Sequence, residues 1–202
     1  MRVAVWGANG RVGSRICAIA TNRCHEVFAV DRHNCTTFDQ VCDVVIDFSS
    51  PSCTEQVVRY CKRHLAPLVV GTTGHNEHQL ALLDDLKNCV NVVVKANFSK
   101  GIELVESVCR QIVSKTHWDV AIVETHHKNK VDCPSGTAKE LAKAVGRADI
   151  SSLRLGNQFG THTILFAGID ECIEVTHRAT SVDVFAIGAI EVAESIAKID
   201  NI

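Results

Sequence analysis

The stretch that decides the fold is Arg2-Val-Ala-Val-Trp6-Gly7-Ala-Asn-Gly10-Arg-Val-Gly13. Its first five residues form a short apolar run typical of a buried strand, and apolar residues at helical spacing follow Gly13. The glycines allow a sharp turn, a close approach of the backbone to a pyrophosphate and tight packing of helix against strand. A glycine triplet alone is equally typical of a plain loop, so its position between a strand and a helix carries the interpretation. The stretch predicts a dinucleotide site with the phosphates at the helix start.

The rest of the first half alternates between strand and helix patterns. Runs rich in valine and isoleucine predict strands at residues 26–31, 44–47, 68–71 and 92–95, and helices are expected at 52–63 and 76–86. This rhythm favours parallel βαβ units wound into a sheet that is covered on both faces, which makes the first half α/β. Only about a dozen residues separate Asp31 from the third strand, which is short for a full crossover helix.

The rhythm changes after Asn97. A helix is expected at 101–114, a strand at 120–124, a polar stretch at 126–136 and a helix at 137–145. Two further strands at 162–166 and 173–179 precede a last helix at 185–199. The second half therefore reads as an α+β module whose strands pair with one another.

Composition narrows the class of protein. With 46% hydrophobic and 22% charged residues, the 202-residue chain can bury a substantial core. The net charge is −2 and the basic residues are scattered, so we expect no nucleic-acid partner. No apolar run approaches the roughly 18 residues of a membrane span and no signal sequence is recognised, so we expect a cytoplasmic protein without a membrane partner. The ten cysteines form no C-x-x-C pair, so we expect reduced thiols and no zinc site.

Three segments follow predicted strands, at the carboxyl edge where open parallel sheets bind ligands. Asp31 can accept hydrogen bonds from the ribose hydroxyls of NADH, while Arg32 can meet the 2′-phosphate of NADPH; the alternative for Asp31 is a turn or N-cap residue. Gly71-Thr-Thr-Gly74 can contact the nicotinamide ribose, and its alternative is a plain turn. The Asn97 amide can orient the nicotinamide carboxamide.

The most informative segment is Glu124-Thr-His126-His127-Lys-Asn-Lys130-Val-Asp-Cys-Pro-Ser135-Gly136-Thr137. It combines proton donors with a helix start that can bind the carboxylates of a substrate. Any one of these residues would more often be structural, but their concentration within a dozen positions favours a functional site. Two adjacent histidines on extended backbone point apart, which disfavours a metal site. Cys133 as a nucleophile remains an alternative, although no activating base is evident.

Together these motifs resemble the 4-hydroxy-tetrahydrodipicolinate reductase (dihydrodipicolinate reductase) family. The resemblance also rests on Asp47-Phe-Ser-Ser-Pro51 and runs from Met1 to about Ile199, and the His-His-x-x-Lys-x-Asp-x-Pro-Ser-Gly-Thr element is its most specific part. It implies a Rossmann-like doubly wound domain at 1–97, to which a helix at 185–202 returns. It further implies a mixed-sheet α+β domain at 98–184 that binds a dicarboxylate substrate and builds a homotetramer. The implied reaction is the NADH- or NADPH-dependent reduction step of diaminopimelate and lysine biosynthesis.

The resemblance also assigns residues. It makes His126 and Lys130 the proton-donating pair, and His127, Gly136 and Thr137 the substrate-binding group, to which the helix start adds Ser135. The residues that it implies for the nicotinamide cofactor are Gly7, Ala8, Asn9, Gly10, Arg11, Val12, Asp31, Arg32, Gly71, Thr72, Thr73, Lys95, Ala96, Asn97 and Phe98.

The chain departs from the family pattern at three places. It is short after Arg32, Cys133 stands where a small residue is usual, and Val182 stands where an arginine is expected. Two alternative functions remain at this stage. One is a non-catalytic dinucleotide sensor, against which His126 and Lys130 argue; the other is a different oxidoreductase with Cys133 as its nucleophile.

Overall fold

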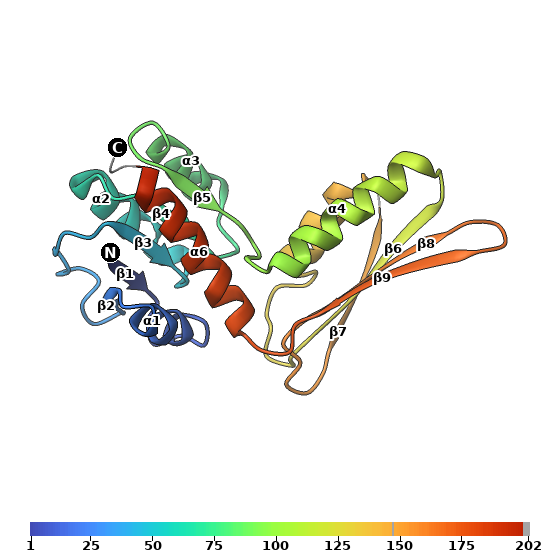
Figure 1. The fold of residues 1–202 in the computed structure, drawn as a ribbon, viewed down its shortest axis with the longest axis horizontal. Helices are drawn as coiled ribbons and strands as arrows, with labels where there is room; N and C mark the ends of the chain where they lie inside the picture. The colour runs from blue at the N-terminus through green and yellow to red at the C-terminus, as the bar shows by residue number, and fades with distance from the viewer. Residues whose placement is uncertain (147, 200–202) are drawn as a thin grey trace. The chain divides into compact units, whose positions relative to one another are not determined.

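The computed structural model describes residues 1–146 and 148–199, and the chain divides into two compact units (Figure 1). Unit 1 consists of Met1–Phe98 and the stretch from Val182 onward, and unit 2 is Ser99–Ser181. Within the described residues, no helix is both long and apolar enough to cross a bilayer.

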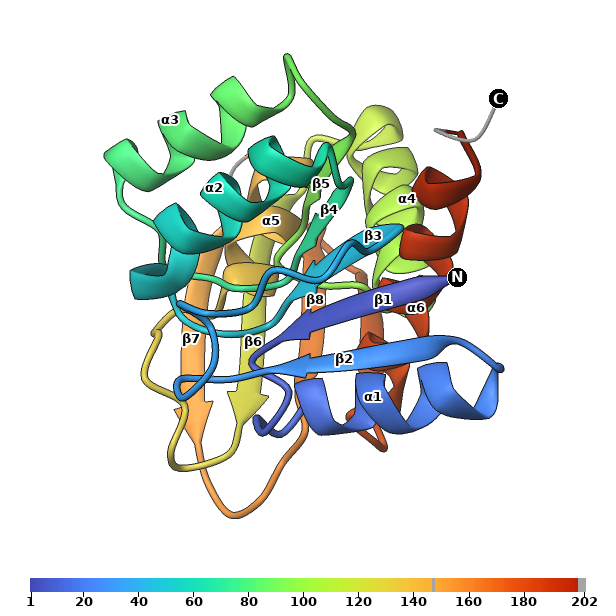
Figure 2. The same cartoon turned by 90° about the vertical axis from the view of Figure 1, so that its left-hand side faces the viewer.

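Unit 1 is built on a parallel sheet with the strand order β2-β1-β3-β4-β5 (Figure 2). The strands are β1 (Arg2–Trp6), β2 (Glu26–Val30), β3 (Val44–Asp47), β4 (Leu68–Val70) and β5 (Val92–Val94). The order reverses between β1 and β3, so the carboxyl ends of these two strands form the switch point at which such sheets bind ligands. The predicted doubly wound sheet is confirmed.

Helices cover both faces of this sheet because alternate strand residues point to opposite sides. Val3 and Val5 of β1 face a core with α1 (Gly13–Asn22) and α6 (Asp183–Ile199). Ala4 and Trp6 face the core of α2 (Thr54–His64), which the short 3-10 helix η1 (Pro51–Cys53) precedes, and of α3 (Glu77–Leu86). The last helix thus belongs to the first unit.

The short connection between β2 and β3 contains turns and no helix among residues 31–43. Phe38 packs this connection against the core of unit 1. Its ring lies 5.3 Å from that of Trp6 and 5.3 Å from that of Tyr60, measured between ring centroids. Because aromatic side chains bury large apolar areas, this cluster attaches the connection to α2 without a helix.

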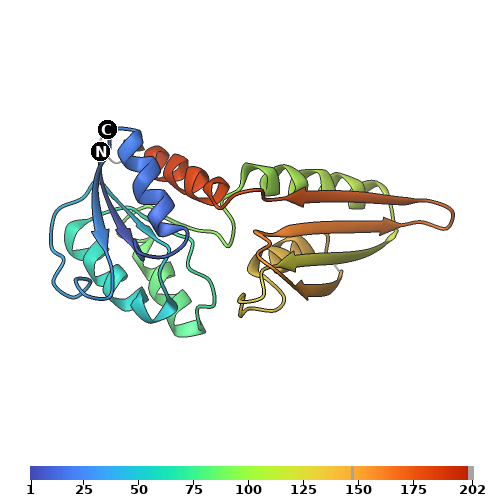
Figure 3. The same ribbon diagram turned by 90° about the horizontal axis from the view of Figure 1, so that it is seen from below.

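Unit 2 has a mixed sheet with the strand order β7-β6-β8-β9. The strands are β6 (Asp119–His126), β7 (Asp149–Arg154), β8 (Thr161–Ala167) and β9 (Cys172–Arg178). β7 runs parallel to β6, whereas the pairs β6/β8 and β8/β9 are antiparallel. The helices α4 (Lys100–Lys115) and α5 (Gly136–Ala144) pack against this sheet over the core of Ile122, Ile164 and Phe166 (Figure 3). The predicted α+β module is confirmed.

Two features of unit 2 differ from the sequence prediction. Strand β7 was not predicted, because its half-buried positions include Ser152 and Arg154 and give no apolar run. β6 extends two residues beyond the expected strand, so His126 is the last residue of a strand and not part of the polar loop. The two differences are connected, because the end of β6 pairs with β7. In this pairing Ser152 lies beside Glu124 and Arg154 lies beside His126.

Candidate active site

In unit 1 the site begins at the glycine turn. Gly7 has a φ of +79°, and a Cβ there would lie 2.4 Å from the carbonyl oxygen of Phe48. A Cβ on Gly13 would lie 2.1 Å from the carbonyl oxygen of Gly7. Backbone cannot move aside for contacts this short, so both positions require glycine. Helix α1 starts with no side-chain cap and no acidic residue in its first turn, so its dipole favours an anion there, although the Ser14 N–H already donates to the Gly10 carbonyl.

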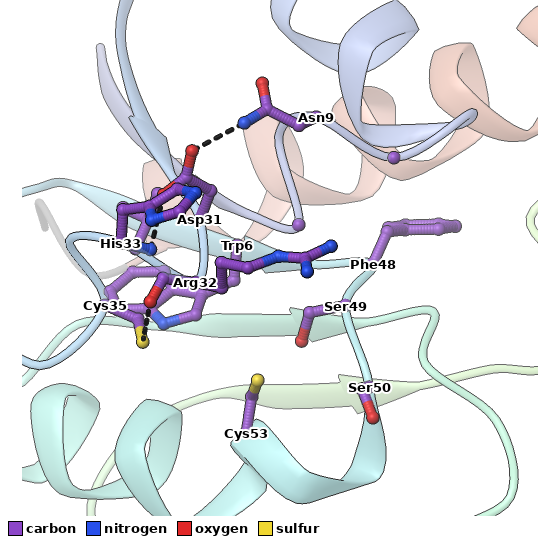
Figure 4. A pocket seen from close by; sticks show the side chains of 13 residues that line it. Trp6, Asn9, Asp31, Arg32, His33, Cys35, Phe48, Ser49, Ser50 and Cys53 are labelled. Carbon is purple, nitrogen blue, oxygen red and sulfur yellow. Dashed lines mark hydrogen bonds between the residues drawn. The ribbon is translucent and has the colours of Figure 1, made fainter.

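A cavity of about 440 Å³ lies next to this turn, at the ends of β1, β2 and β3 (Figure 4). Asn9 donates a hydrogen bond of 2.5 Å from Nδ2 to Oδ2 of Asp31, and the His33 N–H donates to Oδ1 at 2.8 Å. The Asp31 carboxylate is thereby held beside the glycine turn. A cradle without Cβ atoms, an uncapped helix start and a carboxylate at the end of β2 together fit a dinucleotide.

The structure gathers only part of the predicted cofactor residues at this cavity. Those that line it are Gly7, Asn9, Gly10, Asp31 and Arg32. Gly71 to Thr73 follow β4 and Lys95 to Phe98 follow β5, so they lie along the same carboxyl edge but outside this lining. Ala8, Arg11 and Val12 belong to the turn itself.

Three of the predicted cofactor residues outside this lining make structural contacts within unit 1. The Thr72 hydroxyl accepts a hydrogen bond of 2.9 Å from the Ser49 N–H, which links the ends of β3 and β4. A Cβ on Gly71 would lie 2.2 Å from the Phe48 ring, so glycine makes room for that ring. Phe98 is 3% exposed and packs in the core.

The cavity also includes residues that the sequence did not single out for the cofactor. They are Trp6, Val30, His33, Cys35, Phe48, Ser49, Ser50 and Cys53. Phe48 to Ser50 follow β3, which neighbours β1 at the switch point. The pairing of β3 with β1 was the signal that would have found them, and strand order is not evident from the sequence.

In unit 2 the central feature is a buried carboxylate beside His126. Glu124 is 0% exposed and shares the covered face of β6 with His126. Its Oε2 lies 2.5 Å from His126 Nδ1, and its Oε1 accepts a hydrogen bond of 3.1 Å from the Ser135 N–H. An ionised carboxylate can only accept, so Nδ1 carries a proton and Nε2 is the nitrogen free to exchange one.

Arg154 completes this arrangement from β7. Its Nη1 and Nη2 donate to the two Glu124 carboxylate oxygens at 2.8 and 2.7 Å, and Nη2 also donates to the Asp132 carbonyl at 2.7 Å. Such paired contacts are the strongest form of arginine–carboxylate recognition. We did not predict a role for Glu124 or Arg154 from the sequence; the alternation Glu124-x-His126 was the available signal for the first, and nothing marked the second.

The surroundings shift the proton affinities of these groups. Burial alone would raise the pKa of Glu124, but hydrogen bonds from Arg154, His126 and the Ser135 N–H outweigh it and lower this pKa to about 2. Burial lowers the pKa of His126, Lys130 and Arg154 lower it further, and Glu124 opposes them. Burial and the nearby His126 lower the pKa of His162 to about 3. Glu124 is therefore the fixed negative charge of the cluster.

The loop after β6 brings Lys130 close to the same cluster. Lys130 Nζ lies 2.7 Å from Oδ1 of Asp132, and Oδ2 of Asp132 accepts a hydrogen bond of 3.3 Å from the Gly136 N–H. His127 is half-buried directly after the strand. Lys130, Asp132 and the start of α5 thus form one connected segment next to His126.

Both the hydroxyl and the backbone N–H of Ser135 already have hydrogen-bond partners. Its Oγ accepts a hydrogen bond of 3.2 Å from the Ala138 N–H as the cap of α5, and Oγ lies 3.2 Å from Nε2 of His162. Its N–H donates to Glu124, as described above. Gly136 and Thr137 are the first residues of α5, where a helix offers N–H groups to an anion. No group of three or more metal-ligating side chains converges among the residues that the structure describes.

Unit 1 has a glycine turn and a cavity that fit a dinucleotide, and unit 2 has a buried histidine held by a carboxylate. These features are those of an oxidoreductase that depends on a nicotinamide dinucleotide. Residues 1–98 match the family model for dihydrodipicolinate reductase, N-terminus, and residues 101–201 match the model for its C-terminus. The chain belongs to the dihydrodipicolinate reductase family, whose members use NADH or NADPH.

Individual relatives of the chain carry the name of the same family. The chain is 39% identical to 4-hydroxy-tetrahydrodipicolinate reductase of Thermosipho africanus, covering 97% of this chain and 91% of the relative. It is 34% identical to the enzyme of the same name from Clostridium tetani, covering 95% and 89%. A dipicolinate-bound dihydrodipicolinate reductase from Paenisporosarcina sp. TG-14 has the same fold, with a TM-score of 0.73 at 21% identity, over 98% of this chain and 95% of that one. Family membership favours the reductase over the sensor and the Cys133-dependent enzyme.

Proposed function

We propose that this protein reduces 4-hydroxy-tetrahydrodipicolinate to tetrahydrodipicolinate with NADH or NADPH, in the cytoplasm, as a step of diaminopimelate and lysine biosynthesis. The observation that carries the proposal is the buried Glu124–His126–Arg154 arrangement beside the start of α5. The cofactor, when bound, supplies the hydride; everything else is left to side chains that bind the substrate and deliver a proton.

His126 is the proton donor in this proposal. Hydride addition to a conjugated ring leaves negative charge that an acid must quench, and a positioned imidazole is the usual group. Glu124 holds the Nδ1 proton and so fixes the ring with Nε2 as the exchanging atom. Arg154 keeps Glu124 ionised, because its two hydrogen bonds favour the carboxylate over the acid. Glu124 and Arg154 act through His126 and are positioning residues.

Lys130 is the second member of the pair. Its ammonium supplies a compact positive charge for developing negative charge on the substrate and for loss of the hydroxyl group. The substrate carboxylates are assigned to His127, Gly136 and Thr137; a carboxylate at the Gly136 N–H would take the place of Asp132, which accepts the hydrogen bond from that N–H in this structure. Ser135 contributes by capping α5 and by holding Glu124, since its own hydrogen-bonding groups are already engaged.

The cofactor is assigned to unit 1. The pyrophosphate would be held by the turn from Gly7 to Val12 and the start of α1, and the adenosine ribose by Asp31, with Arg32 available for a 2′-phosphate. Gly71 to Thr73 and Lys95 to Phe98 are assigned to the nicotinamide half, because they lie along the same carboxyl edge.

The family resemblance also suggests a homotetramer. The sheet of unit 2 is covered by helices on one face, and the side chains of the other face include Ala121, Val123, Leu153 and Leu165. Leu153 is 49% exposed in the single chain. Partly apolar sheet faces of this kind are commonly buried between subunits. Sedimentation equilibrium of the wild type and of Leu153→Lys tests this assignment, with four copies expected for the first and fewer for the second.

The test of the mechanism is Glu124→Gln. Because Glu124 is the main group that opposes the fall in the His126 pKa, its neutralisation should lower this pKa further. The limb of kcat/KM on which activity falls as pH rises should therefore move to lower pH, and kcat should drop by about tenfold or more. The imidazole ¹⁵N shifts of His126 should change as its fixed tautomer is lost.

The matched control is Glu106→Gln, which removes an exposed carboxylate paired with Arg110 within α4. It should leave kcat and its pH profile unchanged. A Glu124→Gln protein that folds, binds NADH and keeps the wild-type pH profile would remove Glu124 and His126 from these roles.

A further inference from the structure

Two of the ten cysteines stand apart from the rest. Cys42, Cys61 and Cys109 are buried, and burial raises the pKa of each; for Cys109 it reaches about 11. Such thiols are inert toward electrophiles. Cys35 and Cys53, by contrast, are half-buried and line the dinucleotide cavity from the β2–β3 connection and from η1 (Figure 4).

Cys35 differs from Cys53 in one further respect. It also lines a second cavity of about 140 Å³, between the β2–β3 connection and α2, which Cys53 does not line. Cys35 therefore borders both cavities, and a molecule attached to its sulfur lies close to each.

The second cavity carries positive charge. Arg59 and Arg63 line it from successive turns of α2. The opposing charge is Asp39, which lies 3.2 Å from Arg63 and 2.8 Å from His64. The remaining polar members are Thr36, Gln56 and Tyr60. Two guanidinium groups line this cavity against one carboxylate, which pairs with Arg63 and His64, so the lining has a net attraction for anions, and guanidinium is well suited to carboxylates.

We propose that Cys35 is a site of S-thiolation by anionic low-molecular-weight disulfides. The Cys35 thiolate attacks one sulfur of the disulfide, a new S–S bond forms, and the other half leaves as a thiolate that takes a proton from water. The reaction exchanges one disulfide for another and needs no further oxidant. Arg59 and Arg63 bind the carboxylates of the half that stays attached.

The modification should control cofactor binding. Cys35 borders the dinucleotide cavity, so an attached peptide-sized group and the adenosine half of the dinucleotide compete for space. This consequence rests on the proposed function, because it takes the ligand of the larger cavity to be NADH or NADPH. A reducing thiol reverses the exchange and should restore binding.

The experiment compares two disulfides of opposite charge on the reduced, full-length protein. Oxidised glutathione carries carboxylates, whereas cystamine carries amines. Intact mass and peptide mapping over time should show faster modification of Cys35 by oxidised glutathione, and Arg59→Ala should abolish that preference. NADH and ADP-ribose should slow the reaction at Cys35, whereas nicotinamide mononucleotide should not.

Binding supplies the second readout. Fluorescence titration should show NADH affinity reduced by at least about tenfold after thiolation, because the adduct and the adenosine half of NADH compete for the same cavity. Cys35→Ser should show no change between its treated and untreated forms, whereas the matched variant Cys53→Ala should remain sensitive.

Each alternative result contradicts a stated part. Equal or faster modification of Cys35 by cystamine would overturn the role of the arginines. Thiolation confined to Cys53 or to the exposed Cys24, Cys89, Cys133 and Cys172 would overturn the site. If the untreated wild type fails to bind NADH, the proposed function fails, while thiolation at Cys35 is still measured by mass.

Discussion

The glycine turn of unit 1 and the His126 cluster of unit 2 are built on different principles. The turn depends on the absence of side chains: a Cβ on Gly7 or Gly13 would meet backbone within 2.4 Å. The His126 cluster depends on side chains from two strands and a loop, which meet at the buried Glu124 carboxylate.

The comparison shows how each site responds to change. The glycine turn is encoded within a dozen residues, so a substitution in it should disturb the turn and leave the rest of the unit in place. A cluster made by Glu124, His126, Ser135 and Arg154 spans a separation of 30 residues between Glu124 and Arg154, so the loss of one member leaves its partners buried without compensation. The following predictions test this difference.

The largest effect is expected for Arg154→Ala. It leaves the fully buried Glu124 carboxylate without its bidentate partner, and removal of one member of a buried ion pair costs about 3–5 kcal/mol. Chemical denaturation followed by circular dichroism measures the free energy of unfolding. Arg110→Ala, which breaks an exposed pair with Glu106, should cost less than about 0.5 kcal/mol. Similar losses for both variants would mean that the cluster is not a buried unit.

His126→Gln should come next. Loss of the proton donor should lower kcat by on the order of 10² or more, while NADH affinity stays within about twofold, because His126 belongs to the unit that does not hold the glycine turn. Steady-state kinetics and fluorescence titration separate the two quantities. An unchanged kcat would show that the proton comes from elsewhere.

Gly13→Ala should have the converse effect. The new Cβ displaces the Gly7 carbonyl and thereby the turn, so NADH affinity should fall by about tenfold, with a stability loss of about 1–3 kcal/mol. Thr21→Ala, at an exposed position in the last turn of α1, serves as the control. Calorimetric titration measures the NADH affinity of both variants. Unaltered affinity in Gly13→Ala would argue against a pyrophosphate at this turn.

The smallest effect is expected for Asp31→Ala. Loss of the carboxylate should weaken NADH about fivefold, equivalent to a net hydrogen bond of ~1 kcal/mol, and should weaken NADPH less because Arg32 remains for the 2′-phosphate. Parallel titrations with both dinucleotides measure the ratio. Equal weakening would indicate that Asp31 only positions Asn9, its partner at 2.5 Å.

Much of unit 1 could be predicted because its signals are local. The valine-rich strands, the glycine turn and the cap of α3 by Asn76 each depend on neighbours within a few residues. What could not be predicted were the members of the cavity that follow β3, since their place depends on β3 lying beside β1. The length of the segment after Asp31 showed that a full crossover helix had little room, but it did not predict that Phe38 would pack this connection against Trp6 and Tyr60.

In unit 2 the sequence singled out the segment from His126 to Thr137 as the candidate catalytic segment, but it did not show which groups hold that segment in place. Ser152 and Arg154 made β7 too polar for a strand prediction, and Arg154 is needed there because it pairs with the Glu124 carboxylate of β6. A pattern of apolar residues therefore fails where a strand buries charge.

By itself the sequence determined the doubly wound class of unit 1, and it singled out the glycine turn as the predicted dinucleotide site and His126 and Lys130 as the predicted proton-donating pair. These follow from backbone conformation and residue chemistry, which act over short distances along the chain. Only the tertiary structure decided that Glu124 is ionised between Arg154 and His126, that Ser135 is already engaged, and that Cys35 borders two cavities. Charge, burial and access depend on which distant segments meet, and that information exists only once the chain has folded.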